Sequence, residues 1–203
     1  MMKKIILTTV TIIGSFFSFY SQEIVGGLKI SPNYALVFDN KPLKDATNKE
    51  YPIIGSIGYG LGYYERMRLN DKVELQAEIN YTLHNFNRKV EINSIKKNDF
   101  WTISFIDIPL IAKRKFNDFS VGLGLMYRKS LSGNQKTEDI VNDQKTITDN
   151  EITPKSEFSF VLDLNYKVNK LNLGLRIFRG NSNFLETGNP PIYSAFNLGI
   201  DLF

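Results

Sequence analysis

The sequence predicts an all-β fold, an eight-stranded antiparallel up-and-down transmembrane β-barrel. Three observations predict it. Apolar and polar residues alternate with a period of two, as in strands that have two different faces. The alternating segments run for roughly 10–14 residues, whereas globular strands usually have about 5–6 and membrane-crossing strands need about 9–11. Long and short connections alternate strictly, which in an antiparallel barrel gathers the long loops at one rim.

The composition excludes several other classes of protein. The chain is 42% hydrophobic and 13% aromatic, too apolar for a disordered protein. It has no Cys and a single His, which excludes disulfides, thiolate metal sites, cysteine nucleophiles and His-rich metal sites. The net charge of +4 is too small and too evenly spread for nucleic-acid binding. We therefore expect no nucleic-acid partner, no cofactor and no metal site.

Residues 1–21 have the pattern of a secretory signal peptide. Lys3 and Lys4 form a basic start, an apolar run extends from Ile5 to Phe19, and Ser21 precedes the expected cleavage point. The apolar run is shorter than the roughly 20 residues of a membrane-spanning helix. A retained N-terminal membrane anchor is the alternative. Residues 22–203 form the expected barrel domain.

Eight strands are expected along the chain, and their sequence patterns support the barrel. They are 25–38, 53–67, 73–83, 101–113, 119–128, 158–166, 171–178 and 196–202. The first sets Leu28 against Lys29, and the second carries alternate glycines, interpreted as a small-residue stripe on the inner wall. The third alternates most clearly, from Val73 to Leu83. The fourth changes phase near Phe105, which indicates a β-bulge, and the remaining four alternate regularly.

The connections fall into two groups. The short ones are Asn- and Asp-containing turns at 68–71, 115–118 and 167–170, and the fourth short connection is where the termini meet. The long ones, rich in Asn, Lys, Asp and Thr, are expected at 39–50, 86–99, 130–155 and 180–191.

Aromatic residues cluster near both expected ends of the strands. Those near the long loops are Trp101, Phe105, Tyr127, Phe158 and Tyr193, and those near the short turns are Tyr63, Phe116, Phe119, Tyr166 and Phe203. Aromatic girdles at both membrane interfaces are typical of such barrels. The alternative is the general preference of aromatic residues for strands.

Three segments and one residue resemble a known family. The phrase from Val73 to Tyr81, the phrase from Ile106 to Lys113, and Gly26–Lys29 resemble strands of the PorT-like outer-membrane β-barrel domain family. The resemblance implies a cell outer-membrane location, contact with membrane lipids and lipopolysaccharide, and recognition of Phe203 by the barrel-insertion machinery.

The polar face carries both signs of charge. Its ionisable residues are Lys29, Arg66, Glu74, Glu78, Asp107, Lys113, Arg128, Asp163, Arg176 and Asp201. Eight strands leave an interior wide enough only for side chains. We therefore expect a lumen filled by a mixed-charge network, without an open pore.

No residue pattern indicates catalysis. His84 is the only His, and a catalytic role would need a nucleophile and an orienting acid, for which Ser104 and Asp99 are the candidates. Arg88, Lys89, Lys96 and Lys97 could contact lipopolysaccharide or form a solvated loop. We expect a monomeric, non-enzymatic barrel with a structural or surface-interaction role and an unknown surface or envelope protein partner. The alternatives are a lipid A-modifying enzyme using His84 and a secreted lipocalin-like binding protein.

Overall fold

The computed structural model describes residues 24–203 except 40, 93–94, 142–143 and 182–188. The expected signal peptide at 1–21 lies outside the described residues, as does most of the expected loop 180–191. In the described part of the chain, no helix has the length and apolarity needed to cross a membrane.

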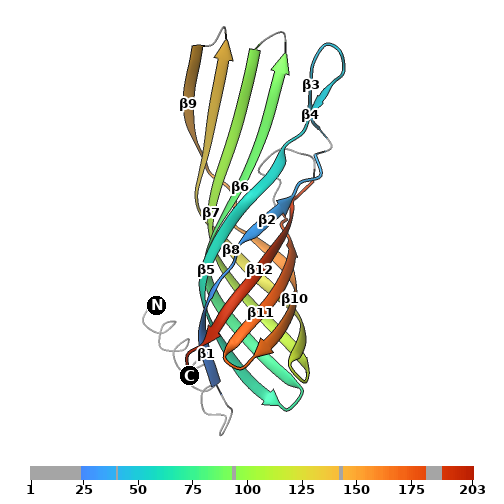
Figure 1. The fold of residues 1–203 in the computed structure, drawn as a ribbon, viewed down its shortest axis with the longest axis vertical. Helices are drawn as coiled ribbons and strands as arrows, with labels where there is room; N and C mark the ends of the chain where they lie inside the picture. The colour runs from blue at the N-terminus through green and yellow to red at the C-terminus, as the bar shows by residue number, and fades with distance from the viewer. Residues whose placement is uncertain (1–23, 40, 93–94, 142–143, 182–188) are drawn as a thin grey trace, which may run out of the picture.

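The strands close into one antiparallel ring (Figure 1). They are β1 Ile24–Ile30, β2 Asn33–Leu36, β5 Ile54–Asn70, β6 Val73–Ile92, β7 Ile95–Phe116, β8 Phe119–Val141, β10 Glu157–Val168, β11 Leu171–Arg179 and β12 Ile192–Asp201. Both β1 and β2 pair with β12 on one side and with β5 on the other, so they form one interrupted strand of the ring. The predicted eight-stranded barrel is confirmed.

The predicted short turns are also confirmed. Each joins neighbouring strands at the same rim, and Asn117 and Asn169 adopt left-handed backbone angles with φ of 57° and 56°. Asn tolerates this conformation better than most residues. The turn at 68–71 is stabilised by the Asn70 side chain, whose Oδ1 accepts a 2.9 Å hydrogen bond from the Lys72 backbone N–H.

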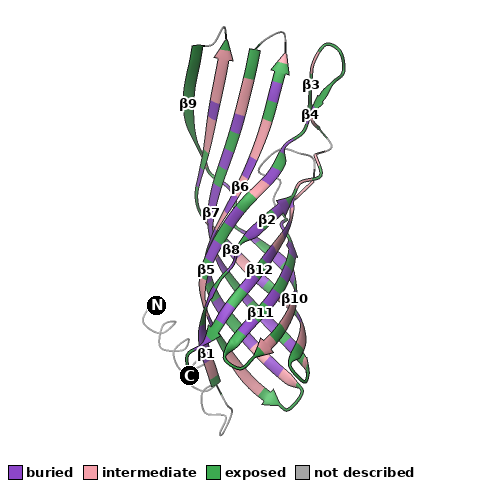
Figure 2. Ribbon diagram, viewed as in Figure 1, coloured by how far each residue is buried: buried purple, intermediate pink, exposed green. Residues whose placement is uncertain are grey.

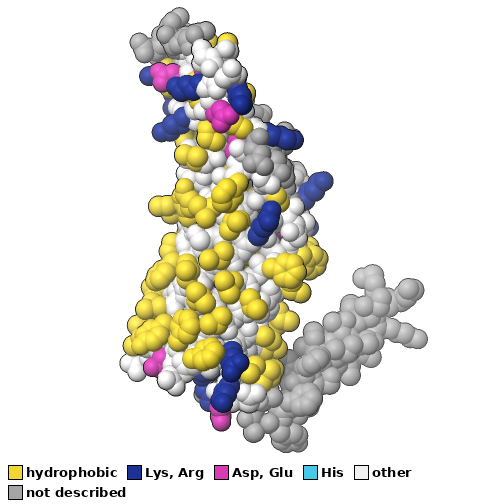
Figure 3. All heavy atoms as spheres, turned by 90° about the vertical axis from the view of Figure 1, so that its right-hand side faces the viewer, with side chains coloured by type: hydrophobic (Ala, Val, Ile, Leu, Met, Phe, Trp, Pro, Cys, Tyr) yellow, Lys and Arg dark blue, Asp and Glu magenta, His cyan; other side chains and the backbone are white. Residues whose placement is uncertain are grey.

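The two faces of the wall are those that the alternation predicts. Outward residues are apolar and exposed, with Leu123 at 67% and Phe160 at 77% exposure. On the face that Figure 3 shows, apolar side chains cover the barrel wall, and most of the charged side chains lie above them or at the lower end. Inward residues such as Glu78, Asp163 and Arg176 are buried (Figure 2). This arrangement argues against the lipocalin-like alternative, which requires an apolar interior.

The expected long loops 86–99 and 130–155 are mostly strand, which corrects the prediction. β6 and β7 continue as a hairpin to Ile92 and Ile95, and β8 forms a second hairpin with β9, Gln144–Ile152. Together β6, β7, β8 and β9 project beyond the barrel as an open sheet (Figure 1). Most side chains of this sheet are exposed or half-buried, apart from a few such as Val90, Asp99 and Thr137. Its sequence therefore lacks a continuous apolar face and has the composition of a loop. A shorter hairpin of β3, Leu43–Lys44, and β4, Glu50–Tyr51, lies in the expected loop 39–50.

The phase change near Phe105 has a different cause from the one expected. Along β7 the odd-numbered side chains point inward throughout, from Trp101 and Phe105 to Asp107 and Ile111. What changes is the interior, which is apolar from Trp101 to Phe105 and mixed further down, where Asp107 and Lys113 alternate with Ile111. A register shift does occur between Ser104 and Phe105, but the extra residue is Leu131 of β8.

The girdle prediction is correct at one rim and partly wrong at the other. Near the short turns, Phe116, Phe119, Tyr166 and Phe203 are exposed on the outer wall. Near the long-loop rim, Trp101, Phe105 and Tyr193 are instead buried inside. There the outer wall carries the pair Tyr127 and Phe158, whose ring centroids lie 5.1 Å apart.

Candidate functional site

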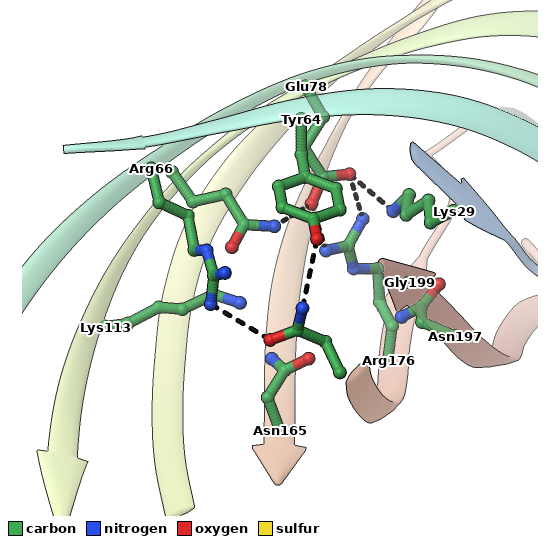
Figure 4. A pocket seen from close by; sticks show the side chains of 11 residues that line it. Lys29, Tyr64, Arg66, Glu78, Lys113, Asn165, Arg176, Asn197 and Gly199 are labelled. Atoms are coloured by element: carbon green, nitrogen blue, oxygen red, sulfur yellow. Dashed lines mark hydrogen bonds and ion pairs between the residues drawn. The ribbon is translucent and has the colours of Figure 1, made fainter. Parts of the chain in front are cut away.

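The middle of the lumen is a network of ion pairs centred on Glu78 of β6 (Figure 4). Its carboxylate accepts a 2.6 Å bond from Lys29 Nζ and two 2.7 Å bonds from the Arg176 guanidinium. Arg176 Nε also donates to Asp163 at 2.8 Å, and Lys113 Nζ lies 2.7 Å from the same carboxylate. These side chains come from different strands around the ring, so they cross-link opposite walls.

A second layer lies toward the short turns and centres on Asp201 of β12. Tyr64 Oη and Asn172 Nδ2 donate to Asp201 at 2.6 and 2.7 Å. Arg66 and Lys167 form ion pairs with the same carboxylate. Between the two layers remains a cavity of about 20 Å³, lined by residues that include Lys29, Tyr64 and Arg176.

The lumen is therefore filled by side chains, as predicted. A cavity of about 20 Å³ is roughly the space that one water molecule requires. The alternate glycines help to make this filling possible, because a Cβ at Gly62 would collide with the Asn80 side chain and one at Gly58 with the Leu83 backbone.

Toward the long-loop rim, Arg128 closes the lumen. It is fully buried, and it donates through Nε to Asp107 at 3.0 Å and through Nη1 to Glu157 at 3.1 Å. Three aromatic rings surround its guanidinium, with centroids 4.2 Å away for Phe105, 4.6 Å for Tyr193 and 4.9 Å for Phe178. Cation–π contacts and ion pairs together compensate the burial of this charge.

His84 belongs to this plug. It is 1% exposed, and its Nε2 lies 2.7 Å from Arg128 Nη2. Since arginine can only donate, Nε2 accepts, and the ring proton is assigned to Nδ1. The ring nitrogen that could act as a base is thus engaged by a cation.

The structure does not place the candidate partners of His84 around it. Ser104 Oγ is hydrogen-bonded to Ser132 Oγ at 2.7 Å. Asp99 accepts bonds of 2.7 Å from Arg88 and 2.8 Å from Thr137. No group of three or more acidic or His residues that could hold a metal ion occurs within the described ranges.

Sequence reasoning missed the aromatic members of the plug. The sequence did contain a signal for Phe178. In this strand the even-numbered residues Asn172 and Arg176 form the polar, inward face, and Phe178 continues that face. Tyr193 gave no such signal, because it precedes the expected strand 196–202.

The projecting sheet carries its own ion pairs in solvent. Glu138 lies 2.9 Å from Lys145 and 3.0 Å from Lys136. The hydrogen bond from Lys145, followed by that from Lys136, lowers the pKa of Glu138 below its ordinary value. Two of the basic residues that could contact lipopolysaccharide have acidic partners: Arg88 pairs with Asp99, and Lys96 Nζ lies 3.6 Å from Glu91.

The model of the family described as "Outer membrane protein beta-barrel domain" matches residues 18–186. The chain belongs to this family. It is therefore an outer-membrane protein, and its apolar outer band faces lipid. A search of curated proteins finds no match.

This outer-membrane barrel is also similar to solved structures at low identity. Ail, the attachment invasion locus protein of Yersinia pestis, is 11% identical with a TM-score of 0.40, over 89% of this chain and 97% of that one. Neisserial surface protein A is 10% identical with a TM-score of 0.37, over 89% and 97%. The outer membrane protease OmpT from Escherichia coli is 8% identical with a TM-score of 0.44, over 89% and 96%.

Proposed function

We propose that this outer-membrane barrel is a non-enzymatic surface protein whose projecting sheet binds a protein partner. The lumen is occupied by ion pairs and an aromatic plug, which suits an anchor better than a channel. In outer-membrane barrels the rim with the longer connections faces outward. The sheet of β6, β7, β8 and β9 then stands in the medium.

The observation that carries the proposal is the edge of β9. Within the described residues β9 pairs only with β8, and its side chains are exposed apart from Ile152. A strand edge offers a row of N–H and C=O groups to which an extended peptide segment can add. The opposite edge of the sheet is covered, because Tyr51 Oη of the β3–β4 hairpin donates a 2.5 Å hydrogen bond to the Glu91 carbonyl.

Three finer assignments belong to the same proposal. The chain is a PorT-like member of its family, on the strand phrases that begin at Val73 and Ile106. Phe203 is the residue read by the insertion machinery; it is 69% exposed, and its carbonyl accepts a 3.2 Å bond from Gly26 N–H. The protein is a monomer, because the closed ring leaves no strand edge in the lipid layer.

Display of the sheet can be tested with single cysteines, since the chain has none of its own. Thr148→Cys on β9 should react with a membrane-impermeant maleimide on intact cells. Asp118→Cys at the opposite rim should react only after lysis. Labelling of both, or of Asp118→Cys alone, would contradict the proposed orientation.

Binding of a protein partner by the projecting sheet is tested by deleting part of β8 and β9. Cells that carry a variant lacking residues 135–150 should adhere several-fold less to a surface coated with serum proteins than cells with the full chain. A gel shift between unheated and boiled samples confirms that both barrels are folded. Equal adhesion by the two folded barrels would contradict the proposed function.

A further inference from the structure

A pocket opens on the outer wall where the barrel meets the projecting sheet. Its volume is about 490 Å³, and it lies between β7, β8 and the segment that joins β9 to β10. We propose that it binds the sugar headgroup of an outer-leaflet glycolipid such as lipopolysaccharide. This site is separate from the β9 edge and does not depend on the function proposed for that edge.

The pocket exists because the wall is interrupted on one side of β8. The ladder between β10 and β8 ends at Glu157, opposite Arg128. The ladder between β9 and β8 begins at Ile152, opposite Gly133. Neither described ladder includes residues 129–132 of β8, which also contain the bulged Leu131. The joining segment 153–156 bridges this gap, and Ser156 Oγ accepts a 3.4 Å bond from the Ser130 backbone N–H.

The position of the pocket matches the level of lipid headgroups. The outward pair Tyr127 and Phe158 lies directly below it, and aromatic residues of this kind mark the membrane interface. Lys129 is two residues beyond Tyr127, roughly 7 Å along a strand. The headgroup layer on each side of a bilayer is about 5–8 Å thick. Lys129 and Thr102 line the pocket and are exposed, so the pocket opens toward that layer.

The chemistry of the lining fits a sugar. Six hydroxyl groups line it, those of Thr102, Ser104, Ser130, Ser132, Thr153 and Ser156. The amide of Asn134 and one residue of each charge, Lys129 and Glu151, complete the polar lining. Leu83, Leu131, Ile152 and Pro154 supply an apolar part of the lining. The many neutral donors and acceptors with balanced charge favour a polyhydroxylated group over a bare anion. Lys129 then pairs with an anionic substituent of the sugar, and Glu151 accepts bonds from its hydroxyls.

The test uses the full chain, folded into phosphatidylethanolamine vesicles that contain either lipopolysaccharide or phosphatidylglycerol. After mild detergent extraction, native mass spectrometry measures the lipid retained by each barrel. The wild type should retain lipopolysaccharide in preference to phosphatidylglycerol. Lys129→Gln should weaken retention about tenfold, the value of a lost charge-assisted hydrogen bond, and Thr153→Trp should abolish it by filling the pocket.

Lys155→Gln is the matched control, because Lys155 is an exposed neighbour that does not line the pocket. It should retain lipopolysaccharide as the wild type does, and all variants should show the heat-dependent gel shift of a folded barrel. Equal retention by wild type and Thr153→Trp would overturn the proposal, as would equal losses in Lys129→Gln and Lys155→Gln or equal retention of phosphatidylglycerol. Soluble glucosamine 6-phosphate that binds as tightly as lipopolysaccharide would assign the pocket to free sugar phosphates and overturn the glycolipid assignment.

Discussion

Replacing Glu78 by Gln should destabilise the barrel more than any comparable change at its surface. The Glu78 carboxylate has no exposed surface and accepts bonds of 2.6–2.7 Å from Lys29 and Arg176. Without its charge, the middle layer of the lumen would hold Lys29, Lys113 and Arg176 against the single carboxylate of Asp163. Breaking one partner from a buried ion pair costs about 3–5 kcal/mol, so we expect a loss of this size in the free energy of unfolding.

The single Trp of the chain makes the measurement direct. Trp101 is buried near the rim, so its fluorescence reports urea unfolding of the barrel in lipid vesicles. Glu50→Gln is the control, because the pair between Glu50 and Lys44 is exposed and exposed pairs contribute little. Combining Glu78→Gln with Lys29→Met should recover part of the lost unfolding free energy, because the second change removes the lysine charge that Glu78→Gln leaves without its partner. A loss below about 1 kcal/mol for Glu78→Gln would refute the reasoning and indicate a hydrated, easily rearranged lumen.

Three further predictions follow from the faces, the plug and the sheet. Leu123→Arg on the lipid-facing wall should cost about 2–4 kcal/mol in lipid, whereas Ile147→Arg on β9 should leave the unfolding curve unchanged; equal penalties would show that the faces are wrongly assigned. His84→Ala should leave the lipid A of the cells unchanged by mass spectrometry, and an acyl-chain difference that the substitution removes would establish an enzyme. The folded-state pKa of Glu138 is depressed. Its ion pairs should therefore stabilise the fold fully above the unfolded-state pKa of Glu138, and this stabilisation should be lost as the pH falls through the folded-state pKa. In an NMR titration, Lys145→Gln should raise that folded-state pKa, and an unchanged value would contradict the ion pair.

The wall of the barrel was predictable because lipid imposes a strict alternation on it. Leu123 and Leu162 had to face the hydrocarbon, which left Asp163 and Arg176 no place but the lumen. The turns were predictable for a similar local reason, since Asn117 and Asn169 suit a left-handed backbone.

Two features could not be read from the sequence. The projecting parts of β6, β7 and β8 and all of β9 carry polar residues on both faces, and most of these residues are in contact with water. The alternation of polar and apolar residues is therefore lost there, although the strands continue. The plug around Arg128 depends on register across the ring, which brings Tyr193 and Phe178 beside the guanidinium although no local pattern links them. His84 was correctly placed near the long-loop rim, but its engagement by Arg128 depended on the same distant contacts.

The ion pairs of the lumen also constrain the order in which the barrel can assemble. Glu78 is separated from Lys29 by 49 positions in the chain and from Arg176 by 98, and Arg66 is separated from Asp201 by 135. Some pairs, such as Arg176 with Asp163, form between neighbouring strands, but these three long-range pairs form only when strands distant in the sequence have come together. A charge left without its partner in a low-dielectric interior is costly. Before the ring closes, the charged side chains that will face the lumen must therefore stay hydrated. For the long-range pairs, that water can leave only when β12 pairs with β1, so we expect closure of the ring and burial of these charges to occur together.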